Sequence, residues 1–395
     1  MSARVQTLAV RAGIDRDEAF GAVTPPIVLS SNFSFAGFNQ KRCYDYTRSG
    51  NPTRDLFAGA LAELEGGAGA VATASGMAAV ALVLNALLSP GERIVVPHDG
   101  YGGSWRLFDA LARKGHFELD IVDLTDPRAL ALALAASPKL VWIETPSNPL
   151  LRITDLRFVI DAAHRAGALA VVDNTFLSPA LQRPIEFGAD VVVHSTTKYI
   201  NGHSDVVGGA VVARDAELGA TLGWWANALG LTGAPFDSFL ALRGLRTLDA
   251  RLRVHQENTQ VLAALLDGHR AVRAVHYPGL ASHPGHALAA RQQSGFGAML
   301  SVDLEGGEAA VRAFLDGLEC FTLAESLGGV ESLVAHPATM THAAMTPEVR
   351  AAAGIGDGLL RLSVGIEHAD DLAADIRAAL ERAARAAEAG AAVAR

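Results

Sequence analysis

Lysine is rare in this chain, and one of its four lysines is placed where its amine could do chemistry. Lys198 lies in HSTTKYINGHSD, a few residues after the apolar segment ADVVVH, with Ser195 and Thr197 within three positions of it. A lysine at the carboxyl end of a strand can form a Schiff base with a carbonyl compound, and neighbouring hydroxyls can bind a phosphate. The alternative for the same spacing is a surface lysine in a loop.

A second candidate is the carboxylate that ends another strand-like segment. Asp173 closes ALAVVD (168–173), which should be a central, buried strand. A carboxylate there destabilises the fold unless a cation lies beside it. The protonated ring nitrogen of pyridoxal phosphate (PLP) would be such a cation, and the pairing would keep the ring an electron sink. The alternative is an aspartate that only caps the following loop.

Three further residues could complete a site for a phosphorylated ring compound and an amino acid. Gly76 in ATASGMAAV stands at a turn into a helix, where backbone N–H groups bind anions and glycine permits close approach. Tyr101 is expected in a loop after a strand, where its ring could stack on a planar ring or simply face solvent. Arg361 lies inside LLRLSVG (359–365) and needs a carboxylate, either a substrate's or a structural one.

A sheet must position these residues, and the middle of the chain predicts one. Short apolar segments alternate with helical stretches, which is typical of a parallel sheet covered by helices on both faces. Ligands bind beyond the carboxyl ends of such strands. The expected strands are 92–97, 117–124, 139–145, 168–173, 189–194 and 208–213. The expected helices are 104–115, 126–137 and 154–167, the last with Thr154 as N-cap and Gly167 as C-cap.

The pattern changes after residue 256, and we expect a second, smaller α+β domain there. Its expected helices are 257–267, 307–317 and a terminal helix from 369, and its expected strands are 271–279, 297–306 and 359–365. The organisation expected from the sequence is therefore an N-terminal arm (1–60), a large domain (61–256) and a small C-terminal domain (257–395).

Two N-terminal stretches need separate interpretation. The first 60 residues lack a clear period, which fits an arm that packs on a partner subunit and equally fits a loop-rich cap. Residues 67–88 carry no charge and reach membrane-spanning length. They are half Ala and Gly, and Gly76 would break a single helix, so we expect a buried turn followed by a buried helix.

Composition excludes several classes of protein. The chain has 395 residues, of which 50% are hydrophobic and 19% charged, so a large core is expected and disorder is not. The net charge of -9 argues against nucleic acid as a partner. Cys43 and Cys320 are too few for a disulfide framework or a four-cysteine metal site, and we expect them to be small buried hydrophobes. We expect a soluble, cytoplasmic protein with no membrane partner.

At this point the motifs resemble those of a known family. YDYTRSGNPTRD, ASGMAAV, DGYGGSWRLFD, ETPSNPLLRITD, VVDNTFLSPALQRP, HSTTKYINGHSD, RGLRTL and AESLGGVESL are similar to segments of the Cys/Met-metabolism group of PLP enzymes. The resemblance covers nearly the whole chain. It implies the aspartate-aminotransferase-like fold (fold type I), with a mostly parallel sheet in the large domain and a smaller C-terminal α+β domain.

The resemblance also implies roles for particular residues. Lys198 would carry PLP as a Schiff base and then move protons, with Tyr101 as a second proton carrier. The expected cofactor contacts are Tyr46, Arg48, Gly76, Met77, Tyr101, Asn148, Asp173, Ser195, Thr197 and Lys198. Tyr46 and Arg48 would reach the phosphate held by a neighbouring subunit, in a homotetramer built as a dimer of dimers with shared sites. The expected substrate contacts are Asp45, Arg106, Asn148, Glu325, Ser326 and Arg361.

Within the family, the motifs are most similar to the branch that joins an activated homoserine, usually the O-succinyl ester, to cysteine. Glu325 suits the γ-synthase and γ-lyase branches and could hold the amine of the incoming cysteine. Gly102 and Gly103 stand where methionine γ-lyases usually have a cysteine. Asp45 and Arg106 could bind the distal end of the ester, with the arginine taking a succinyl carboxylate. The implied reaction gives cystathionine in methionine biosynthesis and trans-sulfuration.

Other functions remain open at this stage. A γ-lyase that breaks cystathionine into cysteine, 2-oxobutyrate and ammonia, or a sulfhydrylase that uses sulfide, would share the same residues. A non-catalytic binding protein on this fold is a third possibility, weakened by the intact Lys198. A dehydrogenase is excluded because no GxGxxG follows a strand in the right place.

Overall fold

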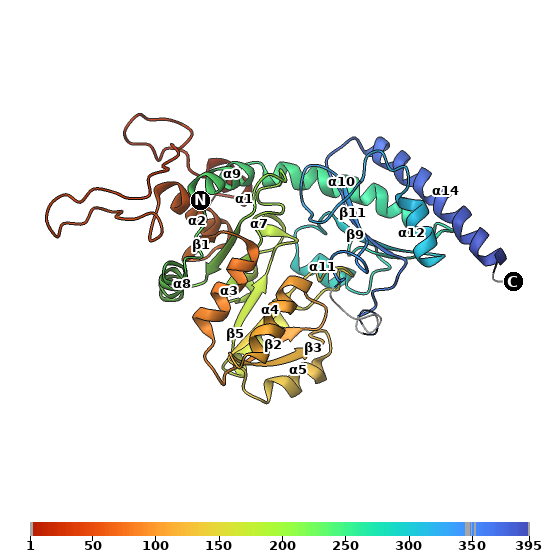
Figure 1. Cartoon of the computed structure of the whole chain (residues 1–395), viewed down its shortest axis with the longest axis horizontal. Helices are drawn as coiled ribbons and strands as arrows, with labels where there is room; N and C mark the ends of the chain where they lie inside the picture. The colour runs from red at the N-terminus through yellow and green to blue at the C-terminus, as the bar shows by residue number, and fades with distance from the viewer. Residues whose placement is uncertain (1–2, 344–347, 349, 351–352, 394–395) are drawn as a thin grey trace. The chain divides into compact units, whose positions relative to one another are not determined.

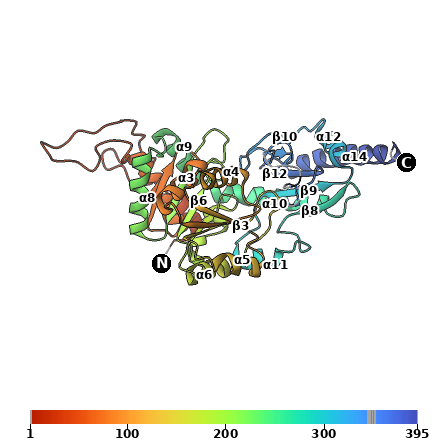
Figure 2. The ribbon, with the colours of Figure 1, turned by 60° about the horizontal axis from the view of Figure 1, so that its bottom comes forward.

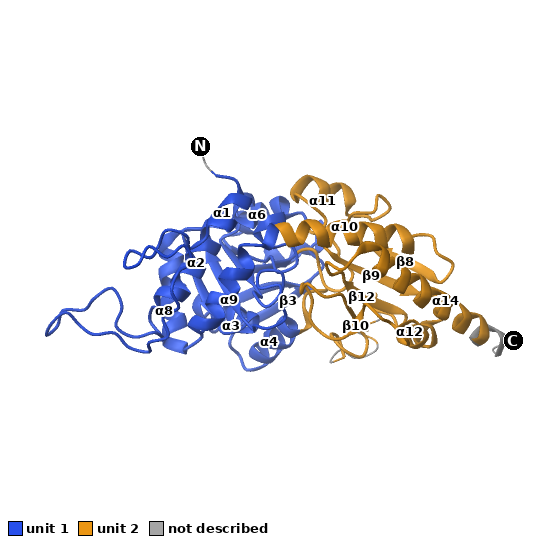
Figure 3. Ribbon diagram, turned by 90° about the horizontal axis from the view of Figure 1, so that it is seen from above, with its two compact units in different colours: residues 1–97, 103–144, 155–249 blue, residues 98–102, 145–154, 250–395 orange. Residues whose placement is uncertain are grey.

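The chain folds into two compact units, coloured separately in Figure 3. The computed structural model describes residues 3–343, 348, 350 and 353–393. Unit 1 comprises residues 1–97, 103–144 and 155–249, and unit 2 comprises residues 98–102, 145–154 and 250–395. Two short loops of the central sequence, 98–102 and 145–154, therefore belong with the C-terminal unit.

Unit 1 is built on a seven-stranded sheet in the order β1-β7-β6-β5-β4-β2-β3. Every strand runs in the same direction except β7, which is antiparallel to both of its neighbours. A mostly parallel sheet was expected and is confirmed. The strands are β1 (Gly69–Thr73), β2 (Arg93–Pro97), β3 (Glu118–Val122), β4 (Leu140–Glu144), β5 (Leu169–Asp173), β6 (Val191–His194) and β7 (Gly209–Ala213).

Helices cover both faces of this sheet (Figure 1). Alternate strand residues such as Trp142 and Val193 share a core with α3, α4 and α8. The intervening residues face the other side, where Glu65 of α2 bonds His194 of β6. The unit 1 helices are α1 (Val5–Arg11), α2 (Pro52–Glu65), α3 (Gly76–Leu87), α4 (Gly102–Arg113), α5 (Pro127–Leu134), α6 (Leu156–Arg165), α7 (Ser178–Leu181), the 3₁₀ helix η1 (Pro184–Phe187), α8 (Ala216–Leu229) and α9 (Pro235–Leu245).

The six parallel strands β1, β6, β5, β4, β2 and β3 all finish at one edge of the sheet. The reversed strand β7 starts at that same edge. A side-chain carbon added at Gly209, the first residue of β7, would lie 2.2 Å from the Ser75 carbonyl oxygen. The end of β1 and the start of β7 are thus in direct backbone contact, which only glycine allows at this position.

Unit 2 is an α+β unit, as expected. Its sheet has the order β10-β11-β12-β9-β8, antiparallel except for the β10–β11 pair. Its strands are β8 (Val272–His276), β9 (Met299–Leu304), β10 (Thr322–Leu323), β11 (Leu333–Ala335) and β12 (Leu359–Ser363). Its helices are α10 (Leu248–Leu266), α11 (His286–Gln292), α12 (Gly307–Leu315) and α14 (Ala369–Val393). Helices α12 and α14 lie together and share one core with β9 and β12 (Figure 2).

Several boundaries differ from those expected. Helix α10 begins at Leu248, so the boundary between the units falls near Asp249 instead of residue 256. Thr154 is not the N-cap of α6; Asp155 caps it by accepting the Phe158 N–H, while Thr154 donates its own N–H to Thr145 Oγ1. The strand β1 before α3 was not expected, nor were α8, α9, β10 and β11.

The N-terminal part of unit 1 has only the short helix α1 before α2, and long loops of the chain project from unit 1 there (Figure 1). These loops leave large apolar side chains in solvent, including Phe20, Leu29 and Phe38. These projecting loops fall within the expected arm (1–60), and the contact of this arm with another subunit stays a prediction. Among the described residues, no helix is long and apolar enough to cross a membrane.

Candidate active site

The carboxyl edge of the large sheet contains an anion-binding arrangement at the start of α3. Ser75 caps this helix, its hydroxyl accepting the Ala78 N–H at 3.0 Å. Gly76 and Met77 are the first two helical residues, and their N–H groups have no acceptor within the helix. Such groups bind phosphates. A side-chain carbon at Gly76 would lie 2.7 Å from Ser195 Cβ, so glycine is required where these two segments meet.

The loop after β6 lies beside this helix start. Ser195 follows directly after β6, and its N–H donates to Thr175 Oγ1 at 2.9 Å. The Thr197 hydroxyl donates to the Gly208 carbonyl at 3.1 Å and accepts the Gly208 N–H at 3.0 Å. The Thr197 hydroxyl must therefore rotate away from Gly208 before it can donate to a phosphate.

Asp173 ends β5, next to β6 in the sheet. Its Oδ1 accepts the Thr175 N–H at 3.0 Å. Burial raises the pKa of Asp173, while hydrogen bonds from Thr175 and the field of His194 lower that pKa. A cation placed against this carboxylate would keep it ionised. Thr175, which contacts both Asp173 and the Ser195 backbone, was quoted in the motif VVDNTF but not recognised as part of the site.

Lys198 lies in a tightly turned part of the loop that joins β6 to β7. Its N–H donates to the Ser195 carbonyl at 3.2 Å, and its carbonyl accepts the Gly202 N–H at 2.8 Å. Tyr199 and Ile200, which follow it, are completely buried and anchor the loop. The backbone of Lys198 is thus fixed relative to Ser195.

A buried polar network supports this edge from the α2 side. Glu65 Oε1 lies 2.6 Å from His194 Nε2 and accepts a hydrogen bond from Asn174 Nδ2 at 2.9 Å. Asn174 follows Asp173, and His194 precedes Ser195, so the network fixes both strand ends. This network could not be predicted from the sequence, because Glu65 is more than a hundred residues away from its partners.

The residues of unit 1 fit PLP. The start of α3 and the Ser195 loop suit its phosphate, and Gly76 leaves the space that a side chain would fill. Asp173 is a half-buried carboxylate at the end of β5 that suits the ring nitrogen, and Lys198 suits the aldehyde. These contacts stay predictions for each residue.

In unit 2, the structure brings together three residues expected to bind a carboxylate. Arg361, on the central strand β12, donates from Nη1 to Asn148 Oδ1 at 3.0 Å and from Nη2 to the Ser326 carbonyl at 2.9 Å. Arg361 and Asn148 are buried. Ser326 has a φ of 84°, a conformation that is unusual for a residue with a side chain. The guanidinium is therefore held in a fixed orientation.

Tyr101 and Glu325, the other candidates of unit 2, are accessible. Tyr101 is 41% exposed. Its loop is fixed by Asp99, whose Oδ2 accepts the Ser147 hydroxyl at 2.7 Å and pairs with Arg152 Nη1 at 3.2 Å. Asp99 thus connects the loop of Tyr101 to the loop of Asn148. Glu325 is exposed beside Ser326.

The remaining candidates lie on exposed parts of unit 1. Arg48 stacks over the Tyr46 ring at 5.6 Å and donates from Nε to Asn227 Oδ1 at 3.1 Å. Asp45 pairs with Lys41 at 3.0 Å and accepts the Ser49 hydroxyl, and these bonds lower the pKa of Asp45 to about 2. Arg106 is exposed on α4.

The large, mostly parallel sheet of unit 1, together with the C-terminal α+β unit, defines a fold type I PLP-dependent enzyme. Residues 6–381 match the family described as Cys/Met metabolism PLP-dependent enzymes, and the chain belongs to this family. The expected family and fold are confirmed.

Individual relatives are similar over nearly their full length. Cystathionine gamma-synthase of Escherichia coli K12 is 56% identical over 95% of this chain and 97% of its own. Cystathionine beta-lyase of Lactococcus lactis subsp. cremoris MG1363 is 46% identical over 96% and 99%. The crystal structure of cystathionine gamma synthase from Xanthomonas oryzae pv. oryzae in complex with cystathionine is 76% identical, with a TM-score of 0.97 over 98% of this chain and all of that one.

Proposed function

We propose that this protein is a PLP-dependent cystathionine γ-synthase, which condenses O-succinylhomoserine or another O-acylhomoserine with cysteine to give cystathionine and the free acid. The observation that carries this proposal is the 76% identity to the Xanthomonas oryzae γ-synthase that was solved with cystathionine. Another structure of that enzyme contains aminoacrylate and cysteine, so both the expected second substrate and the expected product bind to a close relative.

The chain's own residues would share the work as follows. The cofactor, when bound, supplies an electron sink that stabilises negative charge on carbon next to the amino group. The Lys198 amine takes the α-proton and then moves protons at the neighbouring carbons, and each such transfer accelerates the reaction by about 10²–10⁴-fold. The Tyr101 phenol is the second proton carrier. Asp173 holds the charge on the ring nitrogen.

Substrate recognition would depend on charge. Arg361, oriented by Asn148 and Ser326, binds the α-carboxylate through two parallel hydrogen bonds. Arg106 takes the succinyl carboxylate, and Asp45 helps to bind the distal end of the ester. Glu325 holds the amine of the incoming cysteine. An exposed arginine on α4 suits a ligand group that enters from solvent.

The proposal includes an assembly and a compartment. The projecting loops of unit 1 leave Phe20 89% and Phe38 101% exposed, which supports packing against a second copy of the chain. Tyr46 and Arg48 would contact the phosphate bound by that copy, and two such dimers would form a tetramer. Cys43 is exposed and Cys320 is half-buried, so the expectation that both are buried was wrong. Both are free thiols, which suits the reducing cytoplasm.

Product analysis by mass spectrometry tests the function. The purified protein with PLP is incubated with O-succinylhomoserine, with and without cysteine, and with cystathionine alone. We expect cystathionine from ester plus cysteine, with little 2-oxobutyrate. Breakdown of cystathionine without synthesis would refute the γ-synthase and assign a lyase. Replacing the succinyl ester by the acetyl and phospho esters identifies the acyl group.

A further inference from the structure

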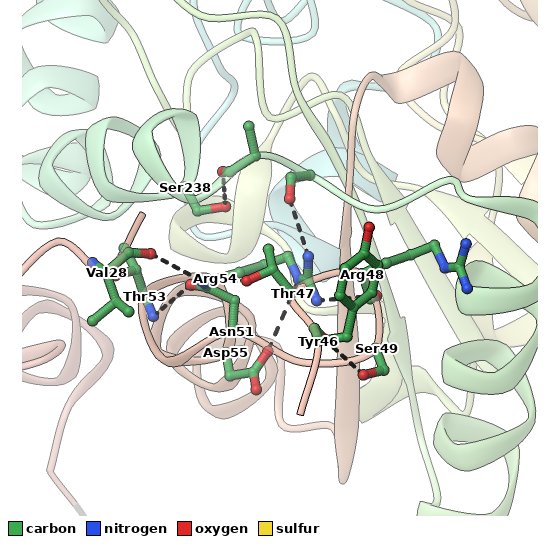
Figure 4. A network of polar contacts seen from close by, with 12 residues as sticks. Val28, Tyr46, Thr47, Arg48, Ser49, Asn51, Thr53, Arg54, Asp55 and Ser238 are labelled. Atoms are coloured by element: carbon green, nitrogen blue, oxygen red, sulfur yellow. Dashed lines mark hydrogen bonds and ion pairs between the residues drawn. The ribbon is translucent and has the colours of Figure 1, made fainter. Parts of the chain in front are cut away.

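Three polar side chains are almost completely buried at the start of α2, directly after the exposed pair Tyr46 and Arg48. Asn51 is 0% exposed, Thr53 is 1% exposed and Arg54 is 5% exposed. We call these three residues the arm clasp (Figure 4). Helix capping explains only part of it: Asn51 Oδ1 accepts the N–H groups of Thr53 and Arg54, and this alone caps α2.

The rest of the clasp holds the arm. The Asn51 amide donates to the Val28 carbonyl at 2.9 Å and to Thr47 Oγ1 at 3.2 Å. Thr53 Oγ1 accepts the Val28 N–H at 2.9 Å. These bonds hold two segments of the arm, one at residue 28 and one at residue 47, against the first turn of α2.

Arg54 extends the clasp in two directions. Its Nη2 donates to the Arg48 carbonyl at 3.3 Å, and its Nη1 donates to the Gly233 carbonyl at 3.3 Å. Asp55 Oδ1 is 4.0 Å from Nε. Burying a guanidinium destabilises the fold unless the charge is well paired and hydrogen-bonded. Here both hydrogen bonds go to neutral backbone carbonyls, one of them at Arg48 itself.

The second of these carbonyls leads to the phosphate end of the large sheet. The Gly233 N–H donates to the Ala72 carbonyl of β1 at 2.9 Å, and Thr232 bridges to Thr73. β1 ends at Thr73, two residues before Ser75, which caps α3. Arg54 therefore bonds to two parts of the chain. One is the Gly233 segment, which pairs with β1 just before the start of α3, and the other is the backbone of Arg48.

We infer that Arg54 is a positioning residue. It couples the phosphate site of its own subunit to the Tyr46–Arg48 pair, which that subunit supplies to the phosphate site of its neighbour. The inference rests on the proposed role of Tyr46 and Arg48. Arg54 touches no cofactor in this scheme: it acts by fixing the Arg48 carbonyl. The Arg48 and Tyr46 side chains are exposed and stacked on one another, and Arg48 Nε donates to Asn227 Oδ1.

A double-mutant cycle on cofactor affinity tests the inference. Apo-protein of the wild type, R54K, R48A and R54K/R48A is titrated with PLP without any substrate. Lysine keeps the charge but cannot hold both carbonyls, so we expect R54K to raise the Kd about tenfold, the value of one charge-assisted hydrogen bond. In the R48A background, R54K should change the Kd less than about twofold, because the Arg48 side chain that Arg54 positions is already removed, although the backbone carbonyl at residue 48 remains.

Two further variants keep the test decisive. N51S keeps a good N-cap but removes both amide donors, so it should weaken PLP binding in the same direction even if R54K fails to fold. R382K is the matched control, because Arg382 also bridges two backbone carbonyls, those of Ala313 and Phe314 in unit 2. It should leave the Kd unchanged.

The outcomes separate this inference from the proposed function. An unchanged Kd in R48A would refute the role of Arg48 and the coupling with it. A weakened R48A with an unchanged R54K, or equal effects of R54K in both backgrounds, would refute the clasp alone. The products formed from any substrate do not enter these measurements, so a different reaction would leave the inference intact.

Discussion

The two units offer different kinds of group to the anions that we propose they bind. Unit 1 offers dipoles from several elements, namely the N–H groups of Gly76 and Met77 and the hydroxyls near Ser195. Unit 2 offers one full charge, Arg361, on a buried strand and oriented by two neutral acceptors. Many weak donors tolerate the loss of one and suit a group that stays bound. A single oriented charge suits a substrate that is exchanged in every turnover. No other residue of that group can replace the charge when it is removed.

The largest effect should come from the one reactive amine. Lys198→Ala should lower kcat/KM by at least about 10³-fold, because the covalent link and the proton carrier are lost together. The yellow absorbance of lysine-bound cofactor should also disappear, while the dipoles of unit 1 still retain free PLP. Lys139→Ala, at an exposed lysine before β4, is the control and should change neither. Turnover retained in Lys198→Ala would contradict the mechanism.

A smaller effect should follow from removing the charge in unit 2. Arg361→Ala should raise KM for the amino-acid substrate about 30- to 100-fold, the value of a charged hydrogen-bonded pair. Arg361→Lys should recover little of this, because an ammonium cannot replace the fork. The Kd of PLP should stay constant in both variants, and Arg273→Lys on β8 should behave as wild type. An unchanged KM would show that Arg361 is structural.

Acid should lower the stability of unit 2. Burial lowers the pKa of His255, His283 and His342 to about 4, and all three lie in unit 2. The unfolded chain binds protons on them near pH 6.5, so stability is full above that pH and is lost as pH falls towards 4. At pH 5 each of these histidines should lower the free energy of unfolding by about 2 kcal/mol.

Urea unfolding between pH 7 and pH 5 measures this loss. The His255→Asn variant keeps a donor for the Val364 carbonyl, which accepts from His255 at 2.6 Å, and should flatten the pH dependence. His269→Asn, at a partly exposed histidine of the same unit, is the control and should leave the pH dependence unchanged. A stability that is constant from pH 7 to pH 5 would contradict the prediction.

The sequence predicted the elements whose residues are apolar throughout. β4, β5 and β6 were recognised because they are hydrophobic runs between capped helices, and their ends place Asp173 and Ser195. β1 was missed because GAVAT is rich in small residues that match a turn or a helix as well as a strand. The direction of β7 could not be predicted, since a buried antiparallel strand in such a sheet is as apolar as a parallel one.

The missed parts of the site depend on contacts between distant residues. Thr175 stands two positions after Asp173, and a hydroxyl at that spacing was a usable signal. The burial of Arg54 could not be predicted, because an arginine in a polar motif is usually exposed. Its burial depends on the contact with Gly233. The pair Glu65 and His194 likewise exists only once α2 covers the sheet.

The reversed strand β7 also sets the order in which the large sheet can be completed during synthesis. The ribosome makes β1 first and β7 last among these strands, yet β1 takes its place in the sheet beside β7. Until residue 213 has emerged, β1 and β6 both present unpaired edges, which are prone to wrong pairing. Gly76 and Ser195 meet only when β7 closes that gap. A cofactor held by Gly76 and Ser195, as we propose, would therefore stabilise the chain only after β7 has completed the large sheet.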